Sequence, residues 1–170
     1  VICAGQEGRA SAALRAMDCE VLPLAWTENS HAGLSDLGLV FQMARRMRAL
    51  RPVAAFGFGG RANLVLGLAA GLSGTPYVAA ASDLGADFAG PGLAARLERR
   101  LQSLIHAGAY ASVFHNPGDL ALFRRLGLTI SRRVELLPGA GVHLARFPFA
   151  PLDRTVTTFA MLAPLRRDKG

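Results

Sequence analysis

The chain has 170 residues, of which 51% are hydrophobic and 18% are charged, a balance typical of one globular domain and not of a disordered segment. No apolar run approaches the roughly 20 residues that span a bilayer, and no basic leader opens the chain. The net charge of +7 comes almost entirely from arginine. Such a positive charge favours phosphates or an anionic membrane as partners. Alternatively, the arginines only form a solvated surface without a specific partner. Nucleic acid is not expected, because no recognition motif accompanies the charge.

Two cysteines without a signal peptide indicate a reducing cytoplasm. The four histidines are scattered without metal-ligand spacing, so no metal site is predicted. The chain lacks an initiator methionine and stops just before a further helix would be expected. We therefore expect it to be truncated at both ends.

Short apolar runs alternate with longer helical patterns along the chain, which predicts an α/β fold. The expected architecture is a Rossmann-like open parallel sheet with helices on both faces, and ligands are expected at the carboxyl ends of its strands. Loops 56–61, 82–87 and 114–116 would share that edge. The predicted strands are 1–4, 20–24, 53–56, 77–81, 111–114, 134–137 and 155–162, and the predicted helices are 7–16, 35–50, 61–72, 93–106 and one from Pro117 to just before Gly127.

Two of the predicted helices carry apolar residues at helical spacing on one side and arginines elsewhere around the helix. In the helix 35–50 and just before it these are Leu34, Leu37, Phe41 and Ala44. In the helix 93–106 and just after it they are Leu93, Leu97, Leu101, Leu104 and Gly108, with Arg96, Arg99, Arg100 and Ser103 on another side.

The run Val53–Leu66, VAAFGFGGRANLVL, places a glycine-rich turn between a strand and a helix. Gly57, Gly59 and Ala62 satisfy the dinucleotide fingerprint, and Asp83 follows the next apolar run, where a ribose-binding acid is expected. The glycines can also serve only to turn the chain. Arg61 places a cation at the start of the helix, which is unfavourable unless it is solvated or faces an anion such as a phosphate.

Three segments further along the chain occur in a characteristic order: FHNPGDLALF at residues 114–123, LPGAGVHLARF at 137–147 and RRDKG at 166–170. Together they resemble the family-four retaining glycosyltransferases of the GT-B fold, and the turn GGRA at residues 59–62 also matches that family. The resemblance covers nearly the whole chain from about residue 19. It implies two Rossmann-like domains, of which residues 1–150 would form the acceptor domain with the hinge. Residues 151–170 would begin a truncated donor domain.

The resemblance also implies which residues bind the two substrates. Gly59, Gly60 and Arg61 would bind a phosphate of the acceptor, whereas Lys169 and Arg166 would bind the diphosphate of the donor. The implied transfer needs no metal and no cofactor apart from the nucleotide sugar that is consumed.

Gly139 and Gly141 would allow the hinge between the two domains to close. Asp83 stands where the family commonly has a histidine near the donor sugar, and it is the candidate catalytic residue. Pro164 stands where the family has the arginine that accompanies Lys169, which is why Arg166 is considered in its place.

The implied function is that of a bacterial hexosyltransferase that uses a nucleotide sugar and acts on a polyprenyl-diphosphate sugar or a surface-polysaccharide acceptor. With most of the donor domain missing, this chain alone is expected to be inactive. Two alternatives remain: an NAD-binding Rossmann domain and a non-catalytic, glycosyltransferase-like binding protein. The expected location is the cytoplasm, with the inner face of the plasma membrane as a candidate docking surface for the arginines of residues 45–51 and 96–100.

Overall fold

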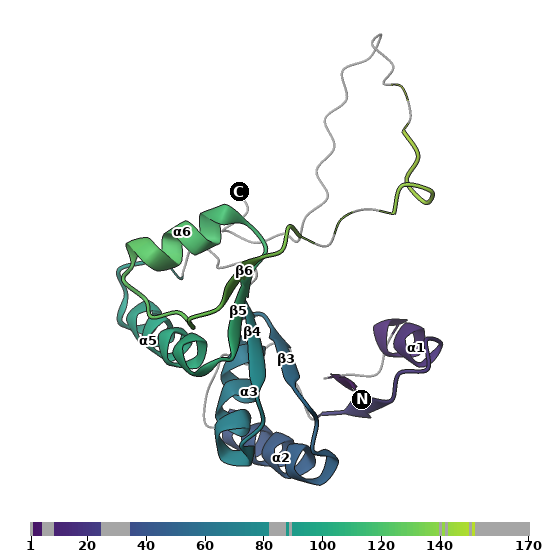
Figure 1. The fold of residues 1–170 in the computed structure, drawn as a ribbon, viewed down its shortest axis with the longest axis horizontal. Helices are drawn as coiled ribbons and strands as arrows, with labels where there is room; N and C mark the ends of the chain where they lie inside the picture. The colour runs from purple at the N-terminus through teal and green to yellow at the C-terminus, as the bar shows by residue number, and fades with distance from the viewer. Residues whose placement is uncertain are drawn as a thin grey trace.

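The computed structural model describes residues 2–4, 9–24, 35–81, 88, 90–139, 141, 143–149 and 151. Within these ranges, strands and helices alternate along the chain (Figure 1). The strands are β1 (Ile2–Ala4), β2 (Val21–Pro23), β3 (Ala55–Phe58), β4 (Tyr77–Ala81), β5 (Ala111–Phe114) and β6 (Val134–Leu136). The helices are α1 (Arg9–Arg15), α2 (Ser35–Leu50), α3 (Gly60–Ser73), α5 (Leu93–Gly108) and α6 (Pro117–Arg125).

The element order confirms the predicted α/β class. Each of these strands and helices overlaps a segment predicted from the sequence, while the expected strand 155–162 lies outside the described residues. The ends of the helices follow local chemistry. Asn116 caps α6 by accepting a hydrogen bond from the Asp119 amide at 2.7 Å, and Pro117 is the first helical residue. After α2, Arg51 adopts a positive φ of 46° and Pro52 prevents the helix from continuing.

Strands β3, β4, β5 and β6 form one parallel sheet in the order of the chain, and β1 pairs with β2 in a second parallel sheet. The register sets Phe58 opposite Ala80 and Ala81 opposite Phe114. The carboxyl ends of β3, β4 and β5 therefore meet at one edge of the four-stranded sheet, as the Rossmann-like prediction requires.

Helices α3, α5 and α6 cover one face of the four-stranded sheet, and α2 packs on α3. Tyr77 and Ala79 of β4 point to that face and share a core with α2, α3 and α5. The alternate residues Val78 and Ala80 cluster only with residues of β5. The prediction of helices on both faces is thus confirmed for this one face, and Val78 and Ala80 on the other face are buried as well. Crossovers between parallel strands are right-handed in nearly all proteins, so strands added in chain order place successive connecting helices on the same side.

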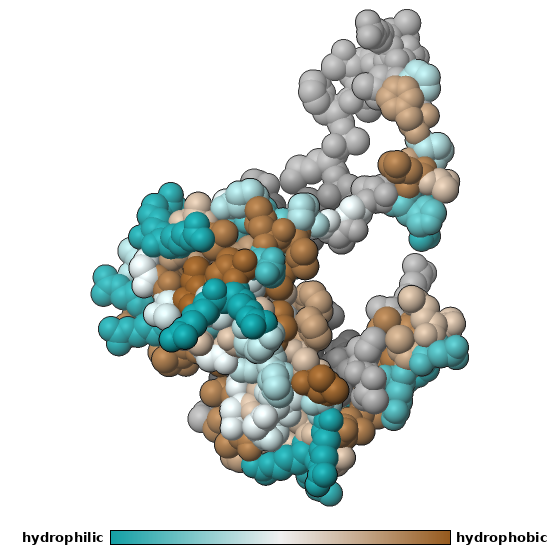
Figure 2. All heavy atoms as spheres, in the orientation of Figure 1, coloured by the Kyte–Doolittle hydropathy of each residue, from teal (hydrophilic) through white to brown (hydrophobic). Residues whose placement is uncertain are grey.

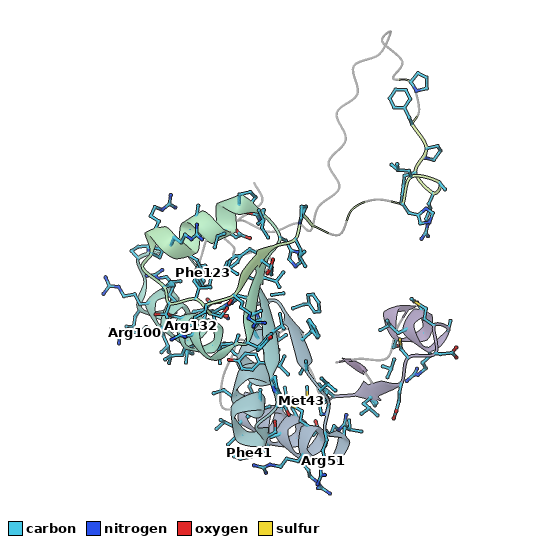
Figure 3. All side chains as sticks on the ribbon, in the orientation of Figure 1. Phe41, Met43, Arg51, Arg100, Phe123 and Arg132 are labelled. Atoms are coloured by element: carbon cyan, nitrogen blue, oxygen red, sulfur yellow. The ribbon has the colours of Figure 1, made fainter. Side chains whose placement is uncertain are left out.

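A second core lies between β5 and α6, where three aromatic rings meet. Phe123 of α6 is fully buried, with its ring centroid 5.2 Å from that of Phe114 and 5.6 Å from that of Phe88. Figure 2 shows apolar side chains gathered where α5 and α6 meet, with charged side chains around them. Figure 3 shows Phe123 on α6 and, at the outer edge of α5, Arg100.

Most of the regularly spaced apolar residues of α2 and α5 are not the ones that these helices bury. Leu37 and Phe41 of α2 are exposed, and of the regularly spaced α2 residues only Ala44 is buried. The helix instead buries Leu39, Val40, Ala44 and Met47. In α5 the exposed fractions of Leu93, Leu97 and Leu104 are 82%, 58% and 69%. That helix buries Gln102, Ile105 and His106.

Candidate functional site

The glycine-rich turn joins the carboxyl end of β3 to the amino end of α3. Gly59 takes φ 87° and ψ 158°, a conformation that only glycine adopts readily. Its amide donates to the Ala80 carbonyl at 3.2 Å, and its carbonyl accepts the first helical hydrogen bond from Asn63 at 2.9 Å. No side chain of the N-cap residue satisfies the amino end of α3. The first amides of a helix and its dipole favour an anion at such a position.

Two neighbouring glycines lie close to side chains of other elements. A Cβ on Gly57 would lie 2.4 Å from the Asn63 Oδ1, so Gly57 allows α3 to pack closely on β3. A Cβ on Gly60 would lie 3.0 Å from the Gln102 Nε2, which donates a 2.8 Å hydrogen bond to the Gly60 carbonyl. Gly57 thus faces α3, which accounts for the first glycine of the fingerprint without a nucleotide.

Arg61 lies one residue after the turn and faces a carboxylate of the same chain. Its Nε lies 3.1 Å from Asp36 Oδ2 and one terminal nitrogen lies 2.5 Å from Asp36 Oδ1, a two-pronged pair between α3 and the first turn of α2. Both side chains are largely buried, and the hydrogen bond to Asp36 raises the pKa of the Arg61 guanidinium. The anion that Arg61 was expected to face is therefore supplied by Asp36.

The amino end of α6 differs from that of α3, although both follow a strand at the same edge. Asn116 accepts from the Asp119 amide, and its own Nδ2 donates to Asp119 Oδ2 at 2.8 Å. Next to it, the His115 Nδ1 lies 3.2 Å from the Leu137 carbonyl oxygen. The start of α6 is thus satisfied by its own side chains, whereas the start of α3 has no side-chain cap and has the Asp36 and Glu98 carboxylates as its nearest negative charges among the described residues.

The sequence-predicted site residues are only partly brought together. Gly59, Gly60 and Arg61 form one turn at the carboxyl edge of the sheet. Asp83, Lys169, Arg166 and Pro164 lie outside the described residues. Of the predicted hinge glycines, Gly141 takes a left-handed φ of 69°, and both Gly139 and Gly141 are exposed.

One polar cluster was not recognised from the sequence. His106 of α5 is fully buried, with its ring between Phe114 and Phe123 and its Nδ1 2.9 Å from the Ser112 Oγ. Its Nε2 has no hydrogen-bond partner among the described residues. Burial lowers the pKa of the imidazole from 6.5 to about 4. The sequence did hold one indication that His106 is special, because helical spacing places it on the opposite side of α5 from the leucines.

The described part of the chain has no group of three or more histidine, cysteine or acidic side chains placed to hold a metal ion. No helix in the same residues has the length and hydrophobicity needed to cross a membrane. Comparison of the chain with protein-family models and with curated protein sequences gives no match.

Proposed function

We propose that this chain is the acceptor half of a retaining glycosyltransferase with the GT-B architecture, which uses a nucleotide sugar and acts on a lipid-linked sugar or a surface polysaccharide. The sequence resemblance suggests this activity. The parallel sheet and the turn at its carboxyl edge are compatible with it. Ligands of open α/β sheets bind outside the carboxyl ends of the strands, which is where Gly59 and Gly60 lie.

The observation that carries the proposal is the start of α3. This 14-residue helix begins without a side-chain cap, directly after Gly59 in its glycine-only conformation. A phosphate of the acceptor would be bound by backbone amides there and stabilised by the positive end of the helix dipole. Asp36 holds the Arg61 guanidinium beside this turn through two contacts and offsets its charge, so the backbone amides and the helix dipole would supply most of the attraction for the phosphate.

The remaining parts of the proposed mechanism rest on the resemblance. Lys169 and Arg166 would stabilise the nucleoside diphosphate as it leaves, Asp83 would contact the reacting sugars, and Gly139 with Gly141 would let the domains close. Electrostatic stabilisation of the leaving group is the main requirement of such a transfer.

The NAD-binding alternative is less favoured by the contacts of the turn. Gly57, the first glycine of the fingerprint, is a strand residue that packs on Asn63. In the dinucleotide motif, the first glycine instead shapes the tight turn itself. The other alternative, a non-catalytic binding protein, uses the same phosphate site and differs only in the lack of turnover.

Calorimetric titration with a short isoprenoid diphosphate tests the proposed phosphate site. We expect binding that weakens at least tenfold in Gly59→Ala, because a side chain there forces the turn out of its conformation. Asp36→Asn retains the arginine and removes a negative charge near the phosphate, so it should bind equally or more tightly. Gly71→Ala is the matched control, since a Cβ at Gly71 of the same helix meets nothing within 4 Å.

The same titration with NADH separates the alternatives. Binding of NADH that depends on Gly59, with no binding of the diphosphate, would replace the proposal with the dinucleotide reading. Diphosphate binding that is unchanged in Gly59→Ala would place the phosphate elsewhere and contradict the proposed site.

A further inference from the structure

The outer surface of α5 is lined by leucines. Leu93, Leu97 and Leu104 are more than half exposed, and Leu101 is partly buried against the neighbouring core. At 100° per residue the three exposed leucines fall within about 40° of one another on the helix circumference. They span about 16 Å along the axis. The side of α5 opposite to them carries Gln102 and His106, which are bonded into the fold.

The exposed arginines of α5 lie next to this leucine stripe. Arg96 and Arg100 are exposed. Around the helix axis, both lie within about 60° of Leu93, on the same flank of the leucine stripe. Arg99 is turned back into the fold, where it donates to the Phe88 carbonyl at 2.6 Å and to the Gly90 carbonyl at 2.8 Å. The outward half of α5 thus combines a leucine stripe with two free-standing cationic side chains.

The acidic residue of α5 does not share that surface. Glu98 lies on the flank next to α3, where its Oε1 is 3.6 Å from the position that a Cβ of Gly60 would occupy. Its charge therefore faces the amino end of α3, away from the leucines. The outward half of the helix presents apolar and cationic groups without a neighbouring carboxylate of its own.

We propose that α5 lies flat in the surface of an anionic bilayer, with Leu93, Leu97 and Leu104 inserted among the acyl chains and Arg96 with Arg100 at the phosphates. Interfacial helices combine these two features, an apolar stripe along the axis and arginines beside it. Long arginine side chains reach the headgroups while their stems stay on the apolar surface. A protein partner would have to satisfy the same cations with carboxylates, whereas anionic headgroups supply negative charge along the whole helix.

The docking surface keeps Arg96 and Arg100 of the sequence-based prediction and adds the exposed leucines of α5 to them. On α2, Arg46 and Arg48 are engaged with the carbonyls of Pro23 and Leu72 at 3.0 and 2.6 Å. The inference about α5 does not rest on the proposed transferase activity, because it uses neither Gly59 nor Arg61.

Vesicle flotation with the full chain tests the inference. We expect binding to vesicles of phosphatidylcholine with phosphatidylglycerol and at least tenfold weaker binding to phosphatidylcholine alone. Leu97→Ser with Leu104→Ser should reduce partitioning at least tenfold, and Arg96→Gln with Arg100→Gln should reduce it on the anionic vesicles only. Because all four side chains are exposed, circular dichroism should show these variants folded.

Leu144→Ser is the matched control, since Leu144 is exposed and lies outside α5. Equal binding by the control and the double serine variant would overturn the inference, as would the absence of vesicle binding by the parent chain. If the parent chain instead forms a dimer that the double serine variant does not, a second copy covers the leucines and the membrane proposal is wrong. In Leu97→Trp, a blue shift of the added tryptophan emission on vesicles would support insertion.

Discussion

Helices α3 and α5 pack against each other, yet they bury different kinds of side chain. Helix α3 buries Asn63 and, after it, a nearly continuous run without polar side chains from Leu64 to Ala70. Helix α5 buries Gln102 and His106 beside Ile105 and leaves most of its leucines at the surface. The two helices show that apolar periodicity identifies a helix more reliably than it identifies the face that meets the core.

The reason lies in the hydrogen bonds that each helix must satisfy. Gln102 donates to the Gly60 carbonyl at the glycine turn, and His106 contacts the Ser112 hydroxyl of β5. A buried polar group without a partner costs about 1–3 kcal/mol. Turning the leucines inward would therefore break these contacts and cover the Gly60 carbonyl and the Ser112 hydroxyl with apolar side chains that cannot hydrogen-bond to them.

Adjacent truncations on α5 provide the sharpest test of this contrast. Ile105 is 6% exposed and Leu104 is 69% exposed. We expect Ile105→Ala to lower the free energy of unfolding by about 2–5 kcal/mol, because it opens a cavity against α3. Leu104→Ala should change it by less than about 0.5 kcal/mol. Urea unfolding followed by circular dichroism measures both, and similar losses for the two variants would contradict the orientation of α5.

The buried imidazole on α5 predicts a loss of stability in acid. His106 is expected to have a pKa near 6.5 when unfolded and about 4 when folded, so the unfolded chain binds the proton more readily. Above pH 6.5 the imidazole is neutral in both states and does not change the free energy of unfolding. As the pH falls from 6.5 toward 4, the proton bound by the unfolded chain lowers the free energy of unfolding by about 3 kcal/mol. The free energy of unfolding of His106→Leu should show a flatter slope between pH 4 and 6.5. An unchanged slope would mean that His106 is not the titrating group.

Glycine substitutions on α3 test how closely the two helices approach. A Cβ on Gly67 would lie 2.6 Å from Cδ1 of Ile105, whereas one on Gly71 meets nothing within 4 Å. We expect Gly67→Ala to destabilise the fold by about 1–3 kcal/mol through overpacking. Gly71→Ala should stabilise it by about 0.5–1 kcal/mol, since alanine loses less backbone entropy in a helix. Thermal melts of the pair measure the difference, and stabilisation by both would indicate a looser contact.

Much of the architecture was predictable because its signals are local. Pro52 and the Asn116-Pro117 pair mark helix boundaries through fixed φ angles and a side-chain cap, and both boundaries are confirmed. The glycine turn at residues 59–60 was recognised for a similar reason, since it joins a strand to a helix within a few residues. Such features depend on neighbours in the chain and need no knowledge of the rest of the fold.

The sequence by itself therefore determined the order of strands and helices, the parallel α/β class and the position of the glycine turn at the carboxyl edge of the sheet. Contacts between distant elements instead place α3, α5 and α6 on one face of the sheet, turn the leucines of α5 outward and set Arg61 against Asp36. Arg61 and Asp36 are 25 residues apart, and which side of a helix becomes buried depends on partners equally distant. Local periodicity carries no information about contacts of that range, because they form only when separate elements pack together.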